Sequence, residues 1–318
     1  MDAGTNNEVS AETRSFSHLP PDVLSSIADR LPVIDLLGFR GTCNDFRSAS
    51  SAASAEIESS RTPWLLLHKT DSSECVIYNE EESKTYHRDI PDLKGAICLA
   101  SYQGWLLLFK DESMFFFCPI SLAKIILPEF PHKQIDGHVA AFSDVPTSSQ
   151  CIVSVINRID EKGVEVNMIS KGQSVWTPHK IPRCNSLTSC IAAATFDRNS
   201  RTFYYMDDGK TMLAFSLNDK RWTPYTIVKG TVSKDIKTMP YCYQKHAFRN
   251  TIEDTRDLFN IEDDEYVSVC GLSYDTDNCH RHLYLNEVVD DSPTKTRVRR
   301  AVWIQPRFFE ADTNQLRW

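Results

Sequence analysis

The sequence lacks any long uninterrupted apolar stretch. None of its apolar runs approaches the roughly 20 residues that a membrane-spanning helix requires. The first 15 residues, MDAGTNNEVSAETRS, also lack the basic start and the apolar core of a secretory signal. We therefore expect no membrane partner, and we expect residues 1–15 to form a disordered polar tail.

The chain also lacks an excess of positive charge. It carries 35 Lys and Arg residues against 43 Asp and Glu residues, which gives a net charge of -8. Nucleic acids and anionic membranes attract proteins through positive charge that displaces counterions. This balance argues against a nucleic-acid partner. The hydrophobic share of 41% and the charged share of 25% are typical of a soluble globular protein.

Motifs of the common catalytic and cofactor sites are missing as well. None of the 11 glycines forms a G-x-G pair, and there is no G-x-S-x-G, H-E-x-x-H or C-x-x-C motif. The nearest approach to a metal site is CHRH, with Cys279, His280 and His282. In a strand the two histidines would share one face and the cysteine would take the other, and no fourth ligand is evident. We therefore expect no catalytic residue, no cofactor and no metal.

The ten cysteines are scattered, mostly within apolar runs such as ECVIY, AICLA and QCIVSVI. A chain of this size without a secretory signal favours buried reduced thiols over disulfides. We accordingly expect the protein in the cytoplasm, in the nucleus or in both.

A basic segment, KTRVRR, covers Lys295 to Arg300. Alternating basic residues in a strand are more often an exposed edge that resists aggregation. We therefore interpret this segment as an edge strand, with a nuclear-import or phosphate-binding patch as the alternative.

What the sequence does contain is a set of short helical segments in residues 19–50, LPPDVLSSIADRLPVIDLLGFRGTCNDFRSAS. Pro20 and Pro21 suit the first positions of a helix, where the missing N–H of proline costs nothing. Pro32 ends this first helix. Between them the spacing predicts a single apolar stripe, made up of Val23, Leu24, Ile27 and Leu31.

Two further helical segments follow the first. We expect Asp35 to cap the second, and the third begins near Asn44. Three helices of this length contain about 32 residues, fewer than the roughly 40 at which a domain usually folds alone. Their apolar surface therefore needs a partner, either the following domain or another protein.

This stretch resembles an F-box, which begins with Leu-Pro and ends in a DLL-x-FR-x-x-C-x-x-(W/F)R pattern, here DLLGFRGTCNDFR. The resemblance implies a module in residues 16–58 that docks on a Skp-type adaptor, which in turn tethers the protein to a cullin scaffold. Phe46 stands where the family most often has tryptophan. Some of the implied adaptor-binding residues would face the adaptor and others the small core of the module. They are Leu19, Pro20, Val23, Leu24, Ile27, Leu31, Leu36, Leu37 and Phe39. The alternative is a helical cap on the C-terminal domain.

Beyond the Ser- and Ala-rich joint RSASSAASAE, the pattern changes to short strand-like runs separated by turn residues. Within them, MISKGQSVWTPHKIP and AFSLNDKRWTPYTIV align, with Trp176 over Trp222 at an offset of 46 residues. Weaker repeats occur at YNEEESKTYHRDIP and FFFCPISLAKIILP. Propeller blades repeat at roughly 40–50 residues. We therefore predict a β-propeller in which Trp176 fills the gap between blades and the aromatic run Phe115 to Phe117 packs between them.

The stretch from Trp64 to about Val228 also resembles the kelch-like propeller of plant F-box proteins, in the phrases DIPDLKGAICLASYQGWLLL, CPISLAKIILPEF, AATFDRNSRTFYYMDD and WTPYTI. The predicted fold class is α+β multidomain, a small three-helix F-box followed by an all-β propeller in residues 62–318. Roughly 250 residues at about 40–46 residues per repeat fit five to seven blades.

The combined resemblance implies a substrate receptor of a Skp–cullin–F-box ubiquitin ligase, whose propeller captures an unknown target protein. A non-ligase F-box scaffold is the second hypothesis. The third is a propeller enzyme acting on a small molecule, with scattered polar candidates that share no motif: His87, His138, His179 and Asp207.

Overall fold

The structure, a computed structural model, describes residues 19–50, 64–79, 82–135, 137–159, 163–181, 191–207, 211–226, 265–270, 272–276, 279–285, 287–289, 297–306 and 317–318. The chain divides into two compact units, Met1–Glu58 and Ser59–Trp318. Among the described helices, none has both the length and the apolar character that crossing a bilayer requires. The predicted polar tail, residues 1–15, lies outside the described residues.

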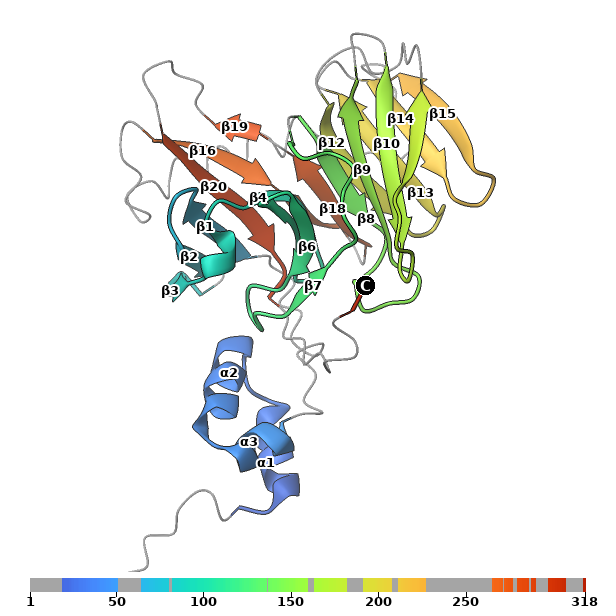
Figure 1. Ribbon diagram of the computed structural model, residues 1–318. Helices are drawn as coiled ribbons and strands as arrows, with labels where there is room; N and C mark the ends of the chain where they lie inside the picture. The colour runs from blue at the N-terminus through green and yellow to red at the C-terminus, as the bar shows by residue number, and fades with distance from the viewer. Residues whose placement is uncertain are drawn as a thin grey trace, which may run out of the picture. The chain divides into compact units, whose positions relative to one another are not determined.

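The first unit contains three helices, α1 (Pro21–Ala28), α2 (Val33–Thr42) and α3 (Asn44–Ala49), as the sequence predicts (Figure 1). Pro20 is the N-cap of α1, and Pro21 occupies its first turn. The prediction that Asp35 caps α2 is wrong. Pro32 is the N-cap, and Asp35 lies in the first turn, where its charge complements the helix dipole.

The small core of this unit lies between the helices. Ala28 of α1 and Leu36 of α2 are buried together, and Leu31 and Phe39 pack against them. The Phe39 ring stacks on Phe46 of α3, with 4.4 Å between ring centroids and 23° between planes. An aromatic ring at position 46 therefore still ties α3 to α2, although it is phenylalanine where tryptophan is usual.

The second unit forms four β-sheets in its described part (Figure 1). The first sheet has the order β19-β16-β20-β1-β2-β3. Its strands are, in that order, Glu287–Val289, Glu265–Cys270, Arg297–Ile304, Trp64–Lys69, Glu74–Asn79 and Lys84–Asp89. A short 3-10 helix, η2 (Pro91–Leu93), leads from it to the second sheet, which has the order β4-β5-β6-β7. The strands of the second sheet are Ile97–Tyr102, Trp105–Lys110, Ser113–Phe117 and Lys124–Ile126.

The third and fourth sheets follow along the chain. The third runs from β8 to β11 in sequence order, with strands Val139–Phe142, Ile152–Arg158, Val164–Ser170 and Thr177–Ile181. The fourth has the order β15-β14-β13-β12-β18-β17. Its strands are, in that order, Arg221–Thr226, Thr211–Ser216, Thr202–Asp207, Ile191–Asp197, Cys279–Leu285 and Leu272–Thr276.

The sheets are arranged as propeller blades are. Each of β4–β7, β8–β11 and β12–β15 is an antiparallel meander in which neighbours in sequence are neighbours in the sheet. Strands of successive sheets contact one another: β20 contacts β4, β4 contacts β8, and β8 contacts β12. Figure 1 shows the β8–β11 and β12–β15 sheets side by side. This confirms the predicted all-β propeller class, and the described residues supply four sheets. The prediction of five to seven blades was derived from the length of the whole unit. That length includes residues 227–264, which lie outside the described residues.

The basic segment near the C-terminus lies inside a sheet. β20 pairs with β1 in antiparallel and with β16 in parallel orientation, so it has a neighbour on both sides. The prediction of an edge strand is therefore wrong. The alternating basic residues of this segment indicate a polar strand, but they do not show which distant strands pair with it. Here β20 pairs with β1, so an early and a late segment of the unit are joined in one sheet.

The aligned tryptophans occupy equivalent places in successive sheets. Trp176 immediately precedes β11, and Trp222 lies in β15, the fourth strands of their sheets. Trp176 meets the Phe130 ring edge-on at 5.0 Å and donates from Nε1 to the Pro128 carbonyl at 3.0 Å. Both partners lie in the segment that leads from the second sheet to the third. Trp222 likewise lies 6.5 Å from the ring of His179 on the third sheet. Trp176 therefore packs on the connection that joins the second sheet to the third, and its place between two blades stays a prediction.

The aromatic run of β6 is also interior. Phe115, Phe116 and Phe117 are buried, and Phe116 meets Phe142 of the third sheet edge-on at 4.9 Å. Phe116 therefore packs against the neighbouring sheet, as predicted. Five described cysteines are free thiols, of which only Cys43 is not fully buried.

A candidate partner-binding face on the helical unit

The predicted adaptor-binding residues separate into a buried, a half-buried and an exposed group. Leu24 and Leu36 are buried, each with 2% of its surface exposed. The half-buried residues are Leu19, Leu31, Leu37 and Phe39. The exposed residues are Pro20, Val23 and Ile27. The first group holds the unit together, and the last is available to another molecule.

The exposed apolar residues gather on one side of α1. Val23 and Ile27 are one helical turn apart, so their side chains lie on the same face of the helix. They are 40% and 37% exposed. Pro20 lies at the start of the same helix, where its carbonyl accepts hydrogen bonds from the backbone N–H groups of Val23 and Leu24 at 3.0 and 3.1 Å. We call Pro20, Val23 and Ile27 the outer face of α1.

The buried side of α1 is made by the neighbouring positions. Leu24 and Ala28 are also one turn apart, and both are 2% exposed. Ser25 Oγ donates a hydrogen bond of 2.5 Å to the Ala49 carbonyl of α3. This contact fixes α1 on α3 and sets which of its faces points outward. The single stripe predicted from spacing is therefore two faces, an inner one with Leu24 and an outer one with Val23 and Ile27.

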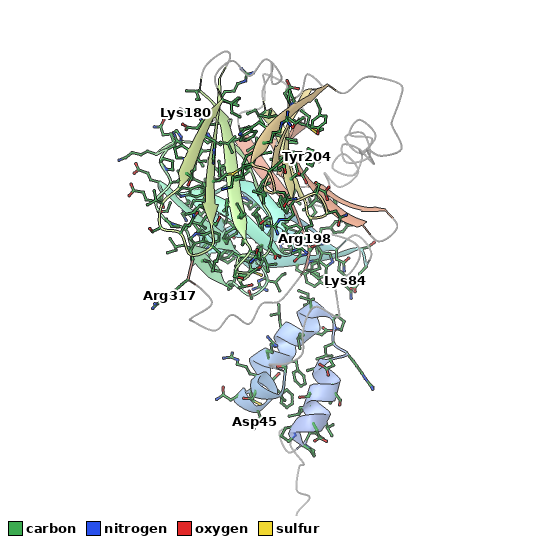
Figure 2. The ribbon with its side chains drawn as sticks, turned by 90° about the vertical axis from the view of Figure 1, so that its right-hand side faces the viewer. Asp45, Lys84, Lys180, Arg198, Tyr204 and Arg317 are labelled. Atoms are coloured by element: carbon green, nitrogen blue, oxygen red, sulfur yellow. The ribbon has the colours of Figure 1, made fainter. Side chains whose placement is uncertain are left out.

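Polar residues surround the outer face. Asp22, Ser26, Asp29 and Arg30 are all exposed around the same helix. Figure 2 shows Asp45 on α3, which also lies at the surface of the unit. An apolar centre with a polar rim is the usual anatomy of a protein–protein interface. The arrangement can therefore bind a protein surface.

The polar candidates of the second unit lie on different sheets. His87 is exposed on β3, His138 is buried just before β8, His179 is on β11, and Asp207 is buried at the end of β13. Burial lowers the pKa of His179. The described residues contain no group of three or more His, Cys, Asp or Glu side chains that could hold a metal ion. The side chains of the CHRH segment lie outside what the structure describes, and its backbone forms the start of β18.

One polar cluster was missed by the sequence analysis. His132 Nε2 and Glu165 Oε2 are 2.6 Å apart, and Asn167 donates from Nδ2 to the same oxygen at 3.2 Å. Lys180 Nζ lies 3.7 Å from Glu165 Oε1. Burial by itself would raise the pKa of the Glu165 carboxyl, but these hydrogen bonds and the nearby cationic groups hold it below its usual value.

This cluster ties the segment between β7 and β8 to β10. Its signal in the sequence was a glutamate and an asparagine at alternate positions of the apolar strand VEVNMIS, which places both on one face. The partner His132 is 33 residues away from Glu165 in the chain, so spacing alone could not identify the contact.

Both units match models of known protein families. Residues 16–53 match the F-box domain model, and residues 76–277 match the KIB1-4 beta-propeller model. An F-box/kelch-repeat protein of Arabidopsis thaliana is 30% identical over 211 residues, which are 60% of this chain and 59% of that protein. An F-box protein of the same plant is 29% identical over 191 residues, 57% of this chain and 39% of its own length. The chain thus spans less than two thirds of these relatives.

Solved structures are more distant. A regucalcin from Agrobacterium tumefaciens aligns at 13% identity and a TM-score of 0.31 over 55% of this chain and 63% of that chain, a likeness too remote to carry an argument. The KIB1-4 model, in contrast, covers more than half of the 318 residues. The resemblance seen in the sequence is therefore confirmed, and the chain belongs to the family of plant F-box proteins that carry a KIB1-4 beta-propeller.

Proposed function

We propose that this protein is a substrate receptor of a Skp–cullin–F-box ubiquitin ligase. Proteins that combine an F-box with a β-propeller generally have this role. The helical unit binds a Skp-type adaptor through the outer face of α1, and the adaptor connects the chain to a cullin scaffold. The propeller holds a target protein. The cytosol and the nucleus are the compartments in which its free thiols would persist.

The observation that carries this proposal is the exposed pair Val23 and Ile27 within the matched F-box. Burying an aliphatic side chain contributes about 1.5–3 kcal/mol. Two such side chains do not by themselves offset an association cost of roughly 4–15 kcal/mol. The half-buried group, Leu19, Leu31, Leu37 and Phe39, therefore contributes additional contact area, and polar residues at the rim add hydrogen bonds.

No catalytic residue is needed in this chain for the proposed role. A receptor accelerates ubiquitin transfer by holding a target lysine near a ubiquitin-charged enzyme, which raises the effective concentration of the two reacting groups. A scaffold that binds the adaptor outside any ligase would share the same outer face. A reconstituted ubiquitination reaction with a bound target separates the two roles, because only the receptor supports transfer.

The test of adaptor binding uses the double variant Val23→Asp with Ile27→Asp in the full chain. We expect recovery of a co-expressed Skp-type adaptor to fall by at least about tenfold, because two charges would be desolvated at the interface. The control is Ile159→Asp, which places one such charge at an aliphatic residue of the second unit that is 50% exposed. Circular dichroism establishes that the helices persist in each variant.

Unchanged adaptor recovery in the double variant would contradict the proposal. Leu24 is not a suitable target for this experiment, since it is buried and its replacement by aspartate would unfold the helical unit.

A further inference from the structure

Arg317 and Trp318 contact two different sheets of the second unit. Figure 1 marks this end of the chain beside β7 and the third sheet. The Trp318 ring lies 5.7 Å from the ring of Phe116, which belongs to β6 of the second sheet. Lys171, in the turn between β10 and β11 of the third sheet, contacts both residues. Arg317 and Trp318 therefore connect two neighbouring sheets that are far from them in the sequence.

On the second sheet, Trp318 packs beside an interior ring. Phe116 is fully buried, and it meets Phe142 of the third sheet edge-on at 4.9 Å. Trp318 thus extends a row of rings that crosses from one sheet to the next. Beside it is an open hollow of about 520 Å³, lined by Lys124, Ile126, Leu127, Pro128, Arg317 and Trp318. Because Arg317 and Trp318 form part of its wall, the shape of this hollow depends on where they lie.

On the third sheet, a single ammonium group contacts both residues. Lys171 Nζ lies 5.3 Å from the Trp318 ring centroid, and it donates a hydrogen bond to the Arg317 carbonyl. Burial lowers the pKa of the Lys171 ammonium group, so water solvates this charge incompletely. A partly desolvated cation is attracted to an aromatic ring more strongly than a fully solvated one.

The turn that carries Lys171 is held by its own hydrogen bonds. The Lys171 N–H donates to the Cys151 carbonyl at 2.9 Å, and the Gln173 N–H donates to the Ser170 carbonyl at 3.0 Å. The Gln173 side chain in turn accepts from the Ser170 N–H at 2.9 Å. Gly172 has a φ of 85°, in the left-handed region that glycine enters without strain. The ammonium group is therefore presented from a well-defined turn.

Arg317 and Trp318 are held by fewer contacts than the core of the sheets. Arg317 is exposed at the outer surface of the unit (Figure 2), and Trp318 is only half-buried. Among the described residues, the contacts that hold this pair are one ring contact, one cation–ring contact and one hydrogen bond. A segment with few buried contacts can open locally while the rest of the fold stays intact.

We infer that Arg317 and Trp318 form a releasable clasp across the second and third sheets, with Lys171 as its latch. In the closed state, Trp318 packs beside Phe116 and Lys171 holds it from the third sheet. In the open state, Arg317 and Trp318 leave these contacts, whereas the strands of both sheets keep their pairing. This conformational device goes beyond the receptor role and does not depend on it.

Amide hydrogen exchange of the full chain, followed by mass spectrometry, tests the clasp. The peptides to compare contain Leu127, whose N–H donates to the Met114 carbonyl at 3.0 Å, and Lys171. Trp318→Ala should speed exchange in both peptides by about threefold to thirtyfold, because the segments on either side of the clasp become less restrained. Exchange in the first and fourth sheets should not change, since their strands lie outside the clasp.

Lys171→Ala tests the latch, because it keeps the Trp318 ring and removes the ammonium group. Exchange in the same two peptides should again rise. The double variant, Lys171→Ala with Trp318→Ala, should exchange as Trp318→Ala alone does, since Lys171 acts on these segments through the clasp.

Two variants elsewhere in the unit serve as controls. Lys84→Ala removes a cation that is paired with Glu82 at 2.8 Å, and Tyr225→Ala removes a 40% exposed ring from β15, the outer strand of the fourth sheet. Both should leave the two peptides unchanged.

Unchanged exchange in Trp318→Ala would overturn the inference. Faster exchange throughout the propeller would also overturn it, because the ring would then be part of the global core and not of a separate clasp. Additive effects of the two substitutions in the double variant would contradict the role of Lys171 as the latch.

Discussion

Val23 and Ile27 lie one turn apart on the outer face of α1, and 40% and 37% of their respective surfaces remain exposed. Their sequence neighbours Leu24 and Ala28 are buried in the helical unit. The two faces of this short helix thus have different roles. The inner face stabilises the helical unit, and the outer face is the proposed contact with the adaptor.

This division predicts different consequences for two similar substitutions. Leu24→Ala should destabilise the helical unit by about 2–5 kcal/mol, because it removes buried methyl groups and leaves a cavity. Val23→Ala should change the stability by less than about 0.5 kcal/mol, because the side chain is 40% exposed and lies outside the core of the unit. Hydrogen exchange of the α1 amides, followed by mass spectrometry in the full chain, measures both effects. Similar exchange rates in the two variants would show that Leu24 and Val23 are not differently buried.

The contact between Trp176 and the segment that connects the second and third sheets predicts a large effect on the stability of the propeller. Trp176→Ala should cost about 3–5 kcal/mol of stability, because the indole fills the space beside Phe130. Trp176→Phe keeps most of this packing and loses the hydrogen bond to the Pro128 carbonyl, so it should cost only about 1–2 kcal/mol. Urea unfolding monitored by fluorescence gives both values.

A matched control for this prediction is the adjacent residue. Val175 is exposed, and Val175→Ala should leave the unfolding midpoint almost unchanged. A loss in Trp176→Ala no larger than that in Val175→Ala would mean that the indole does not support the blade contact.

The Glu165 cluster predicts a dependence of stability on pH. The pKa of Glu165 is lower in the folded chain than its ordinary value of 4.5, so the folded state favours the carboxylate. The resulting stabilisation is present above that ordinary value, and it is lost as pH falls through the folded pKa. Glu165→Gln should therefore be less stable than the unchanged protein by about 1–2 kcal/mol at pH 7, and this difference should shrink as the pH falls below about 4.

Urea unfolding at several pH values measures this difference. Glu129→Gln is the control, because Glu129 is an exposed carboxyl close in sequence to His132. A stability difference for Glu165→Gln that is the same at all pH values would rule out the role assigned to its carboxylate.

Much of the molecule could be predicted from local pattern. Pro20, Pro21 and the apolar spacing identified α1, and the repeated Trp-Thr-Pro phrase identified equivalent strands in two sheets. These features depend on residues close together in the chain, where backbone preference and periodicity act directly. The inner face of α1 was only partly identified, since Ala28 is too small to stand out in an apolar pattern although it lies in the core.

Other features depend on contacts between distant residues. The pairing of β20 with β1 reversed the interpretation of the basic segment, and the pair His132 and Glu165 joins residues that no motif connects. A sequence pattern shows which side chains are apolar, but it does not show which distant residues pack against a given strand or side chain.

The sequence by itself determined the helical module, the strand-rich second unit and the family to which both belong, because short-range periodicity and motif spacing are properties of the chain alone. The tertiary structure decided which apolar residues remain exposed. The packing of α1 on α3 buries Leu24 and leaves Val23 and Ile27 outside, and the folded chain brings the Trp318 ring to 5.7 Å from that of Phe116. Both outcomes follow from the mutual orientation of packed elements, which depends on the whole fold and not on any one segment.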